Sequence, residues 1–370
     1  MTPDPAPMPS LPAPKPTASS DTPDALDALV GALTPDFALR LVAWQRQHGR
    51  HALPWQQTRD PYRVWLSEIM LQQTQVSTVL GYYQRFLERF PTVRALADAH
   101  LDEVLAMWQG LGYYSRARNL HRCAQTVRDQ HGGEFPRTAA QLAELSGIGR
   151  STAAAIASFC FDERVAILDG NVKRVLGRLL AFDGDLASSA QEKRLWRHAE
   201  TLLPAAGTDM PSYTQGLMDL GASLCATRSP QCLLCPVQGL CEAQRRGVTE
   251  QFPIKTRKLK RSRREQWWLW LEHEGRIWLE QRPATGVWAG LWSLPLFDDE
   301  AQLLAQAHAL AAATPEPLPR VDHALTHFDW VLHPRRLVLD RGTEPGRGTW
   351  VARDDLARYA LPAPLKKLLG

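Results

Sequence analysis

Apolar residues recur with a helical period from about residue 36 to residue 246. Phe37, Leu41 and Trp44 follow one another at spacings of four and three, which places their side chains on one face of an α-helix. The same period continues through 64–90 and 101–108. Glycine and proline interrupt it repeatedly, at positions 49, 54, 91, 110, 112, 132, 133 and 136. The pattern therefore predicts an array of short packed helices.

The period changes in the last third of the chain. Two runs rich in Trp, Leu and Ile, 266–272 and 276–281, flank Glu274 and Gly275, which predicts a β-hairpin. Further patterns predict a helix at 303–312, a strand at 337–339 and a short helix at 354–359. Together these elements predict a second, smaller α+β domain.

Composition divides the 370 residues further. Residues 1–30 are rich in Pro, Ala and Ser and are expected to be a disordered tail. The helical domain is assigned to 31–250, a basic linker to 251–264 and the α+β domain to 265–370. The stretch 255–264 carries seven basic residues and no acid. It indicates first a solvated linker and second a surface for polyanions.

The six cysteines are unevenly distributed, because four of them lie between 225 and 241. Such clustering indicates a metal site, and hence a reducing compartment such as the cytoplasm (the nucleoid, in a bacterium). Cys123 and Cys160 stand in apolar helical surroundings and are expected to be buried free thiols. No signal peptide and no apolar run of about 18 residues is present, so no membrane span is predicted.

The spacing of the clustered cysteines is Cys225-x6-Cys232-x2-Cys235-x5-Cys241. Four thiolates within one short loop can surround one compact tetrahedral centre. The spacing differs from the paired C-x2-C units of zinc ribbons, but by itself it leaves both zinc and an iron-sulfur cluster open. Four unrelated core cysteines are disfavoured, because cysteine is a rare residue.

Residues 145–174 combine small residues, one acid and several bases. Gly147 and Gly149 let the backbone approach a phosphate closely, and the amides at the start of the next helix can then bind it. A plain helix-helix turn capped by Ser151 is the alternative. Asp169 follows the apolar run 165–168 and precedes a helix that carries Lys173. It can cap that helix, and it can also hold a carboxylate near a sugar.

Glu68 is the only charged residue within 65–71. On an average helix such a glutamate belongs to the solvated face. An apolar setting would instead raise its pKa, so that the carboxyl stays protonated near neutral pH and can act as a general acid.

The chain resembles the helix-hairpin-helix DNA glycosylases of the endonuclease III superfamily. The cysteine spacing and the stretches VWLSEIMLQQTQV, GLGYYSRARNLH and ILDGNVKRV carry the likeness, and the three stretches are most similar to the adenine-removing branch. The resemblance is strong over 36–246. It implies a [4Fe-4S] cluster on the four cysteines and a monomer that acts on double-stranded DNA containing A:8-oxoguanine or A:G mispairs.

The resemblance also implies catalytic roles. Hydrolysis of the N-glycosidic bond needs an acid for the leaving purine and an anion for the sugar cation. Glu68 would protonate adenine N7 and later activate water, while Asp169, held at a low pKa by backbone amides, would stabilise the cation. Asn171 would orient Asp169 or the water. Bifunctional relatives carry a lysine where this chain has Ser151, so an abasic site without strand cleavage is expected, and Lys173 would be a minor Schiff-base former or a phosphate ligand.

Further residues are expected to read the DNA. Gln72, Gln73 and Tyr113 suit wedging between bases, although surface glutamines and core tyrosines are the plain alternative. By resemblance, Gln73 and Tyr113 lie beside 8-oxoguanine, and Trp55 and Gln215 lie near the adenine pocket. Phosphate ligands are expected among the hairpin residues Gly147, Gly149, Arg150 and Ser151 and the helix residues Arg116, Arg118, His121 and Arg122.

The C-terminal domain resembles the Nudix-fold lesion-reading domain of the same family. It lacks the glutamate-rich REXXEE helix that binds Mg²⁺ and offers only Asp298, Asp299 and Glu300, so pyrophosphatase activity is not predicted. Residues 323–327 (HALTH) replace a Phe-Ser-His element of many members. Thr326 and His327 are expected to bind the lesion. A loop with a structural histidine is the alternative.

Two other functions remain open. A bifunctional pyrimidine-lesion glycosylase and lyase is disfavoured by Ser151 and by the additional domain. A catalytically idle DNA-binding regulator that senses redox state through a cluster is disfavoured because both Glu68 and Asp169 are present.

Overall fold

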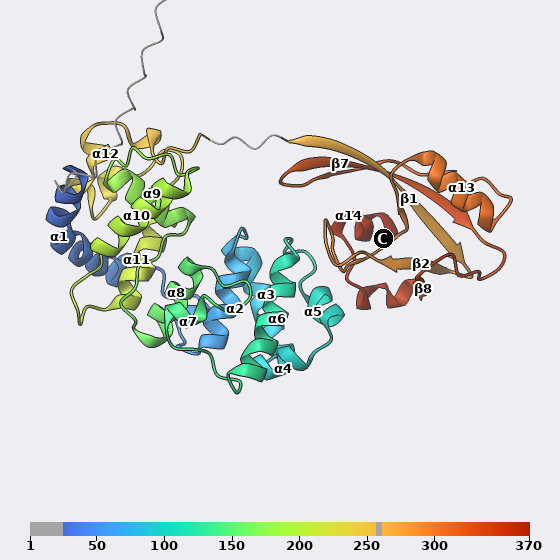
Figure 1. Cartoon of the computed structure of the whole chain (residues 1–370), viewed down its shortest axis with the longest axis horizontal. Helices are drawn as coiled ribbons and strands as arrows, with labels where there is room; N and C mark the ends of the chain where they lie inside the picture. Colours follow the sequence, from blue (N-terminus) through green and yellow to red (C-terminus); the bar gives the residue numbers. More distant parts are fainter. Residues whose placement is uncertain (1–24, 257–260) are drawn as a thin grey trace, which may run out of the picture.

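The computed structural model describes residues 25–256 and 261–370, which form a helical domain and a smaller mixed domain (Figure 1). The first helix begins at Ala25, so the expected boundary of the tail at residue 30 is wrong by six residues, while 1–24 lie outside the described residues. No described helix is long and apolar enough to cross a membrane.

The helical domain has two lobes, each with its own buried core. One core is built from α2–α8, and the other from α1 and α8–α11. The helices are α1 (Ala25–His48), α2 (Pro61–Leu71), α3 (Val76–Arg89), α4 (Val93–Asp98), α5 (Leu101–Met107), α6 (Ser115–Gln130), α7 (Ala139–Leu142), α8 (Arg150–Phe161), α9 (Gly170–Leu179), α10 (Ser189–Thr201), α11 (Met210–Ala222) and α12 (Glu242–Arg245). The predicted array of short helices is confirmed.

Local chemistry determines where the important helices begin. Asp60, Asp169 and Asp209 each accept a hydrogen bond from a backbone amide in the first turn of α2, α9 and α11, which satisfies a donor that the helix cannot pair internally. Between α7 and α8 the chain turns at Gly147, whose φ of +79° places it in the left-handed region. This turn is the predicted hairpin.

The C-terminal domain is an eight-stranded mixed sheet flanked by helices. Its elements are β1 (Ser262–His273), β2 (Arg276–Gln281), β3 (Trp292–Ser293), β4 (Leu296–Phe297), α13 (Glu300–Leu310), β5 (Glu316–Pro317), β6 (Val321–Ala324), β7 (Phe328–Val338), β8 (Gly348–Ala352), a 3-10 helix (Arg353–Arg358) and α14 (Ala363–Leu369). β1 and β7 run parallel over eleven paired positions, from Ser262 and Phe328 to Glu272 and Val338.

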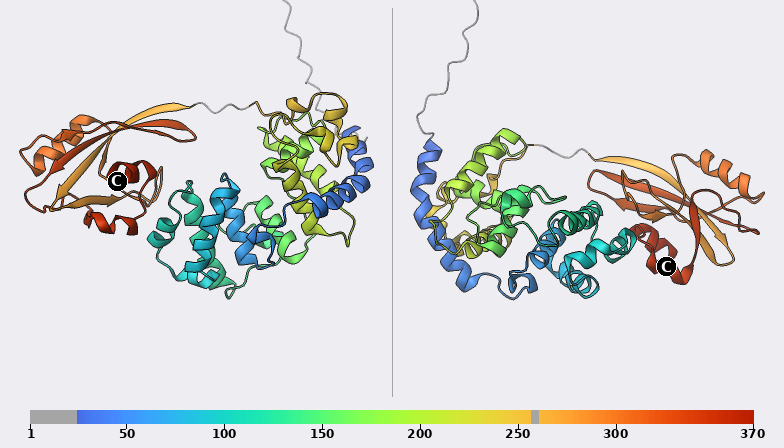
Figure 2. Two further views of the ribbon diagram at one scale, coloured as in Figure 1. Left: turned by 180° about the vertical axis from the view of Figure 1, so that it is seen from behind. Right: turned by 60° about the horizontal axis from the view of Figure 1, so that its bottom comes forward.

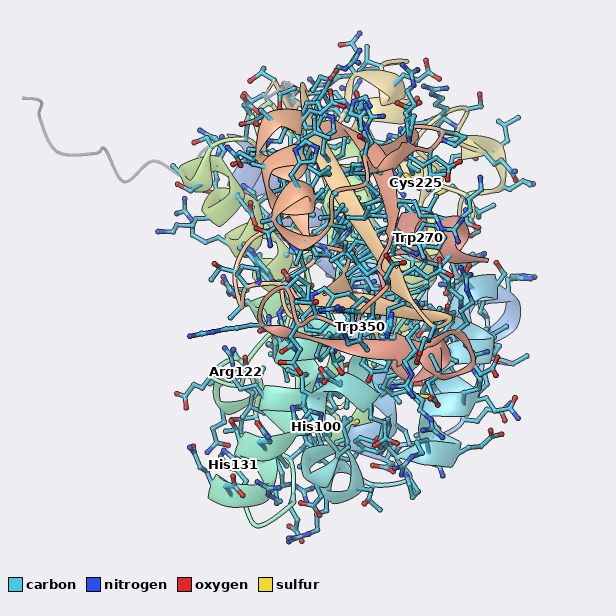
Figure 3. All side chains as sticks on the ribbon, turned by 90° about the vertical axis from the view of Figure 1, so that its right-hand side faces the viewer. His100, Arg122, His131, Cys225, Trp270 and Trp350 are labelled. Atoms are coloured by element: carbon cyan, nitrogen blue, oxygen red, sulfur yellow. The ribbon has the colours of Figure 1, made fainter. Side chains whose placement is uncertain are left out.

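The predicted hairpin is confirmed, because β1 and β2 pair antiparallel around Glu274 and Gly275, both with positive φ. The length of two strands was underestimated. β1 begins at Ser262, within the expected linker, and β7 begins nine residues before the predicted strand at 337. β7 contains Pro334, and a proline within an apolar run weakens the prediction of a strand. Trp270 and Trp350 lie in this sheet (Figure 3).

The two domains lie side by side and contact each other (Figures 1 and 2). One continuous cluster of buried apolar side chains includes Leu105 of the helical domain and Leu361 of the C-terminal domain. Nε2 of Gln109 donates to the carbonyl oxygen of Leu361 at 2.9 Å, and Nη1 of Arg118 donates to that of Ala289 at 2.7 Å. The sequence did not predict this contact.

Candidate active site

A cavity of about 760 Å³ lies between the two lobes of the helical domain. Its walls come from the 3-10 helix Pro54–Gln56, from α2, from the start of α8 and α9, and from α11. Seven residues singled out in the sequence line it: Trp55, Glu68, Gln72, Ser151, Asp169, Asn171 and Gln215. Residues separated by up to 160 positions are therefore brought to one site.

Glu68 reaches this cavity from α2. Its helix neighbours Ser67 and Ile69 are buried, and Glu68 itself is partly buried. Burial, and secondarily the negative charge of Asp169, raises the pKa of Glu68 to about 7. The shift has the predicted direction, because a carboxylate loses hydration energy in a low-dielectric site. The carboxyl can therefore hold a proton near neutral pH.

Asp169 both caps the start of α9 and lines the cavity. Its Oδ1 accepts from the backbone N–H of Val172 at 2.7 Å, and the residue lines the cavity. Burial nevertheless raises the pKa of Asp169, against the lowering by the amides of Val172 and Asn171 and by the charges of Arg174 and Lys173. The expectation of a low pKa is wrong, because desolvation outweighs these partners.

Asn171 and Lys173, which follow Asp169 in the chain, each form a hydrogen bond with another side chain. Oδ1 of Asn171 accepts from Nη2 of Arg174 at 2.9 Å, so the Asn171 amide nitrogen is the end that can serve the cavity. Nζ of Lys173 donates to Oε1 of Glu192 on α10 at 2.8 Å. This predicted phosphate ligand thus forms an ion pair within the protein.

Ser151 connects the hairpin helix to the catalytic segment. Its Oγ accepts from the backbone N–H of Leu168 at 3.0 Å, one residue before Asp169. Gly147 and Gly149 are exposed in the turn, where a phosphate can reach the backbone. Arg150 forms an ion pair with Glu200 and lies over the ring of Trp196, 3.9 Å from its centroid.

The expected wedge residues form a chain of contacts across the domains. The hydroxyl of Tyr113 donates to Oε1 of Gln73 at 3.2 Å and lies 2.9 Å from Oγ1 of Thr326. Gln73 and Tyr113 have φ values of 60° and 50°, a strained backbone that is common at functional sites. Thr326 and His327 are exposed in the turn between β6 and β7, so 323–327 is a strand end and hairpin turn.

The base-pocket candidates take different positions in the cavity. Trp55 is buried, with its ring 5.3 Å from that of Tyr83 in an edge-on arrangement. Gln215 on α11 donates from Nε2 to Oδ1 of Asp219 at 2.8 Å.

Three expected phosphate ligands of α6 are bonded inside the protein instead, and one of them is Arg118, which donates to the carbonyl oxygen of Ala289. The buried guanidinium of Arg116 donates to several backbone carbonyls, including those of Ile69 and Met70 at 2.8 and 2.9 Å, and so completes the end of α2. Nε2 of His121 lies 2.9 Å from the carbonyl oxygen of Ala99. The expectation is wrong for these three, whereas Arg122 lies exposed on α6 (Figure 3).

Two residues of the cavity region were missed by sequence reasoning. Arg50 lines the cavity, and its side chain pairs with the buried carboxylate of Asp219 at 2.7 Å. Asp219 is the only charged residue within α11. The criterion that singled out Glu68, a lone charge in an apolar helix, would also have found Asp219.

The four clustered cysteines line a single pocket together with apolar side chains of α9 and α11. Nη1 of Arg178 donates to Sγ of Cys225 at 3.4 Å, and the same guanidinium donates to the carbonyl oxygens of Ala226 and Thr227. Among the described residues, no three His, Cys, Asp or Glu side chains are arranged to hold a metal ion. A donor set of four thiols beside a buried arginine nevertheless suits an anionic metal centre.

The three consecutive acids that follow β4 form hydrogen bonds or ion pairs within the protein. Asp298 accepts from Gln266, Asp299 caps α13 through Gln302, and Glu300 pairs with Arg335. Among the described residues, no three acidic side chains of this domain are grouped.

Two family models match the chain. Residues 66–201 match the HhH-GPD superfamily of base excision DNA repair proteins, and residues 266–370 match the NUDIX domain. The first match contains Glu68, the hairpin and Asp169, and the second contains Thr326.

Relatives match both domains together. The adenine DNA glycosylase of Buchnera aphidicola subsp. Acyrthosiphon pisum is 35% identical over 339 residues, which cover 90% of this chain and 96% of the relative. The human adenine DNA glycosylase is 33% identical over 402 residues, covering 90% and 73%. Among solved structures, a thermostable thymine-DNA glycosylase superposes with a TM-score of 0.51 at 28% identity, covering 60% of this chain and all of that protein.

Proposed function

The chain belongs to the adenine DNA glycosylases of the HhH-GPD superfamily, and we propose that it removes adenine mispaired with 8-oxoguanine or guanine from double-stranded DNA and leaves an abasic site. The observation that carries this proposal is the pair of carboxyl groups on one cavity, with the pKa of Glu68 raised to about 7. Hydrolysis of an N-glycosidic bond requires one protonated and one charged carboxyl group.

Glu68 acts first as a general acid. Its proton passes to N7 of the adenine, which turns the purine into a neutral leaving group. As the bond to the sugar breaks, positive charge develops on the sugar ring. The ionised Asp169, held by the amide of Val172, stabilises this charge electrostatically. Glu68, now ionised, then takes a proton from the water that attacks the sugar carbon.

The adenine must leave the DNA double helix to reach this cavity, and a protein side chain must fill the gap that it leaves in the base stack. The exposed Tyr113 and the adjoining Gln73 suit this wedging role, because aromatic and amide groups stack between bases. Thr326 and His327 would then read the edge of the opposing purine from the C-terminal domain. Gly147, Gly149 and Arg150 would bind the phosphates of the strand.

Ser151 supports a glycosylase without lyase activity. A strand-cleaving relative needs an amine to form a Schiff base with the sugar. In this chain the corresponding hydroxyl accepts a hydrogen bond from Leu168 and is not a comparable nucleophile. Lys173, paired with Glu192, is left as the minor Schiff-base candidate.

We further propose that Cys225, Cys232, Cys235 and Cys241 hold a [4Fe-4S] cluster. The four side chains line one pocket, and Arg178 offers positive charge to Cys225. A cluster at this place would fix the loop 225–241 against α9 and α11. The absorption spectrum tests the assignment: a broad visible band supports iron-sulfur, and a colourless protein with stoichiometric zinc contradicts it.

Excision on defined duplexes tests the function. The purified protein is incubated with duplexes containing A:8-oxoguanine, A:G or thymine glycol, and each is analysed with and without alkali. Cleavage of the adenine strand only after alkali supports the proposal. Cleavage at thymine glycol without alkali would assign the chain to a pyrimidine-lesion lyase, and binding without cleavage of any duplex would assign it to an idle regulator.

A further inference from the structure

A second cavity, of about 220 Å³, borders a different face of α2 from the active-site cavity, and the mechanism above does not use it. Its polar lining comes from the end of α2, the first turns of α6 and the hairpin, namely from Trp65, Gln72, Ser115, Arg116, Asn119 and Ser146. We call it the α2–α6 pocket. Its volume is several times the roughly 30 Å³ that one water molecule occupies in the liquid, so it can hold a small ion.

Arg116 brings a buried positive charge to this pocket without a counter-ion. The residue is 8% exposed, and its two Nη atoms donate to five backbone carbonyl oxygens and to Oγ1 of Thr74. No carboxylate is among these acceptors. Burial lowers the pKa of Arg116 to about 10, so the guanidinium is still charged at neutral pH. Buried charges are normally paired, yet Nε of Arg116 has no acceptor among the described residues.

Trp65 adds a second buried donor without an acceptor. Its side chain is fully buried, and its Nε1 finds no acceptor in the part of the chain that the structure describes. Further donors come from two amides and two hydroxyls, those of Gln72, Asn119, Ser115 and Ser146. α6 begins at Ser115 without a side-chain cap, so the positive end of its dipole also lies at this pocket.

We propose that the α2–α6 pocket binds a free tetrahedral oxyanion of the phosphate class. A metal cation does not suit the pocket, because none of the described residues that line it is acidic. Water could accept from the two N–H groups, but it would not balance the charge of Arg116. An oxyanion does both, and its several oxygens match donors that converge from α2, α6 and the hairpin.

The depth of the donors favours a free ion over a phosphate of the DNA backbone. A backbone phosphate carries a sugar on two of its oxygens, so it cannot enter a pocket whose N–H groups belong to the buried Trp65 and Arg116. Arg116 thus still makes no contact with DNA. The bound ion would connect the end of α2, just before Gln73, to the hairpin at Gly147.

Nuclear magnetic resonance of the full chain with ¹⁵N-labelled tryptophan tests the site. The chain has 13 tryptophans, and the indole N–H signal that disappears in Trp65→Phe identifies Trp65. Inorganic phosphate is titrated at constant ionic strength, in exchange for sodium chloride, and we expect a saturable shift of the Trp65 signal. Trp330 is the matched control, because its Nε1 is also buried without an acceptor among the described residues, and its signal should not shift.

Asn119→Asp places a negative charge in the pocket and keeps the size of the side chain. We expect its dissociation constant for inorganic phosphate to rise at least about tenfold. Isothermal titration calorimetry measures this constant and needs no signal assignment, so the test stays decisive if Trp65→Phe does not fold. Gln130→Glu, at the other end of α6, adds the same charge outside the pocket and should leave the constant within about twofold of the wild type.

The proposal is overturned if phosphate shifts the Trp65 and Trp330 signals alike, if it leaves the Trp65 signal in place, or if Asn119→Asp binds phosphate as tightly as the wild type. A saturating duplex distinguishes the two sources of the ion. The response of the Trp65 signal to phosphate should persist with the duplex bound. Loss of that response would assign the pocket to a backbone phosphate and overturn the proposal of a free ion.

Discussion

The hydroxyl oxygen of Tyr113 lies 2.9 Å from Oγ1 of Thr326, although the two residues are 213 positions apart and belong to different domains. Because the Tyr113 hydroxyl donates to Oε1 of Gln73, the hydroxyl of Thr326 is the donor to Tyr113. The turn between β6 and β7 is thereby connected to Gln73 in the segment that follows α2, five residues beyond the catalytic candidate Glu68.

Thr326→Val removes the interdomain hydrogen bond and keeps the shape of the side chain. A hydrogen bond of this kind contributes about 0.5–1.5 kcal/mol, so we expect the excision rate on A:8-oxoguanine to fall by about 3–10-fold, with a smaller change on A:G. Single-turnover rates on the two duplexes measure the effect. Thr349→Val on β8 is the control, and an equal loss on both duplexes would show that Thr326 does not read the lesion.

Glu68→Gln and Asp169→Asn test the two carboxyl groups. Each variant removes a charge or proton that the transition state needs, and we expect each to lose adenine excision by several orders of magnitude. Duplex binding, followed by fluorescence anisotropy, should persist because neither residue belongs to the hairpin. Glu88→Gln, an exposed glutamate on α3, is the control. A wild-type rate in either purified variant contradicts the assignment.

The excision rate should depend on the protonation of Glu68. With its pKa raised to about 7, the acid form dominates below pH 7 and decreases about tenfold per pH unit well above it. We therefore expect a single-turnover rate that is flat between pH 5.5 and 6.5 and falls through pH 8. A rate that stays constant up to pH 9 would mean that protonated Glu68 is not the acid.

The same titration should affect stability. The pKa of Glu68 rises from an unfolded value of 4.5 to about 7 on folding, so the folded protein binds more protons between these values and its stability falls as pH increases through that range. Each pKa unit corresponds to about 1.4 kcal/mol, and water in the cavity screens part of this effect.

Glu68→Gln cannot titrate, so its free energy of unfolding should exceed that of the wild type by about 1–2 kcal/mol more at pH 8 than at pH 5. Urea unfolding at the two pH values measures the difference. A pH-independent difference between variant and wild type would show that Glu68 has an ordinary pKa.

Two acidic residues of α10 form ion pairs with basic residues that are expected to bind phosphates. Glu192 pairs with Lys173, and Glu200 pairs with Arg150. DNA must displace these carboxylates, which opposes binding to any duplex. The double variant Glu192→Gln/Glu200→Gln should bind a duplex without a mispair about 3–10-fold more tightly at low salt.

Anisotropy titrations at several salt concentrations measure this binding. The dependence of log K on log salt should become steeper, because each additional phosphate contact adds about 0.9 to the slope. Glu103→Gln, which breaks the exposed ion pair with Arg89 on another face, is the control. An unchanged affinity and slope would show that Arg150 and Lys173 do not contact DNA.

Much of the architecture and part of the site were determined by the sequence alone. Helical periodicity, the Glu274-Gly275 hairpin and the capping position of Asp169 are local properties, because they depend on residues only a few positions apart. The lone charge of Glu68 in an apolar helix indicated a raised pKa for the same reason. The spacing of the four cysteines likewise predicts that they share one site.

Only the tertiary structure decided which distant residues meet. Arg116 was expected to bind a phosphate, but α2 ends beside it and supplies carbonyl acceptors. The pKa of Asp169 was expected to be low, but the lobes that close over it remove water. The contacts of Tyr113 with Thr326 and of Arg50 with Asp219 follow from how helices and domains pack. Desolvation and long-range proximity are properties of the packed molecule, and no local pattern encodes them.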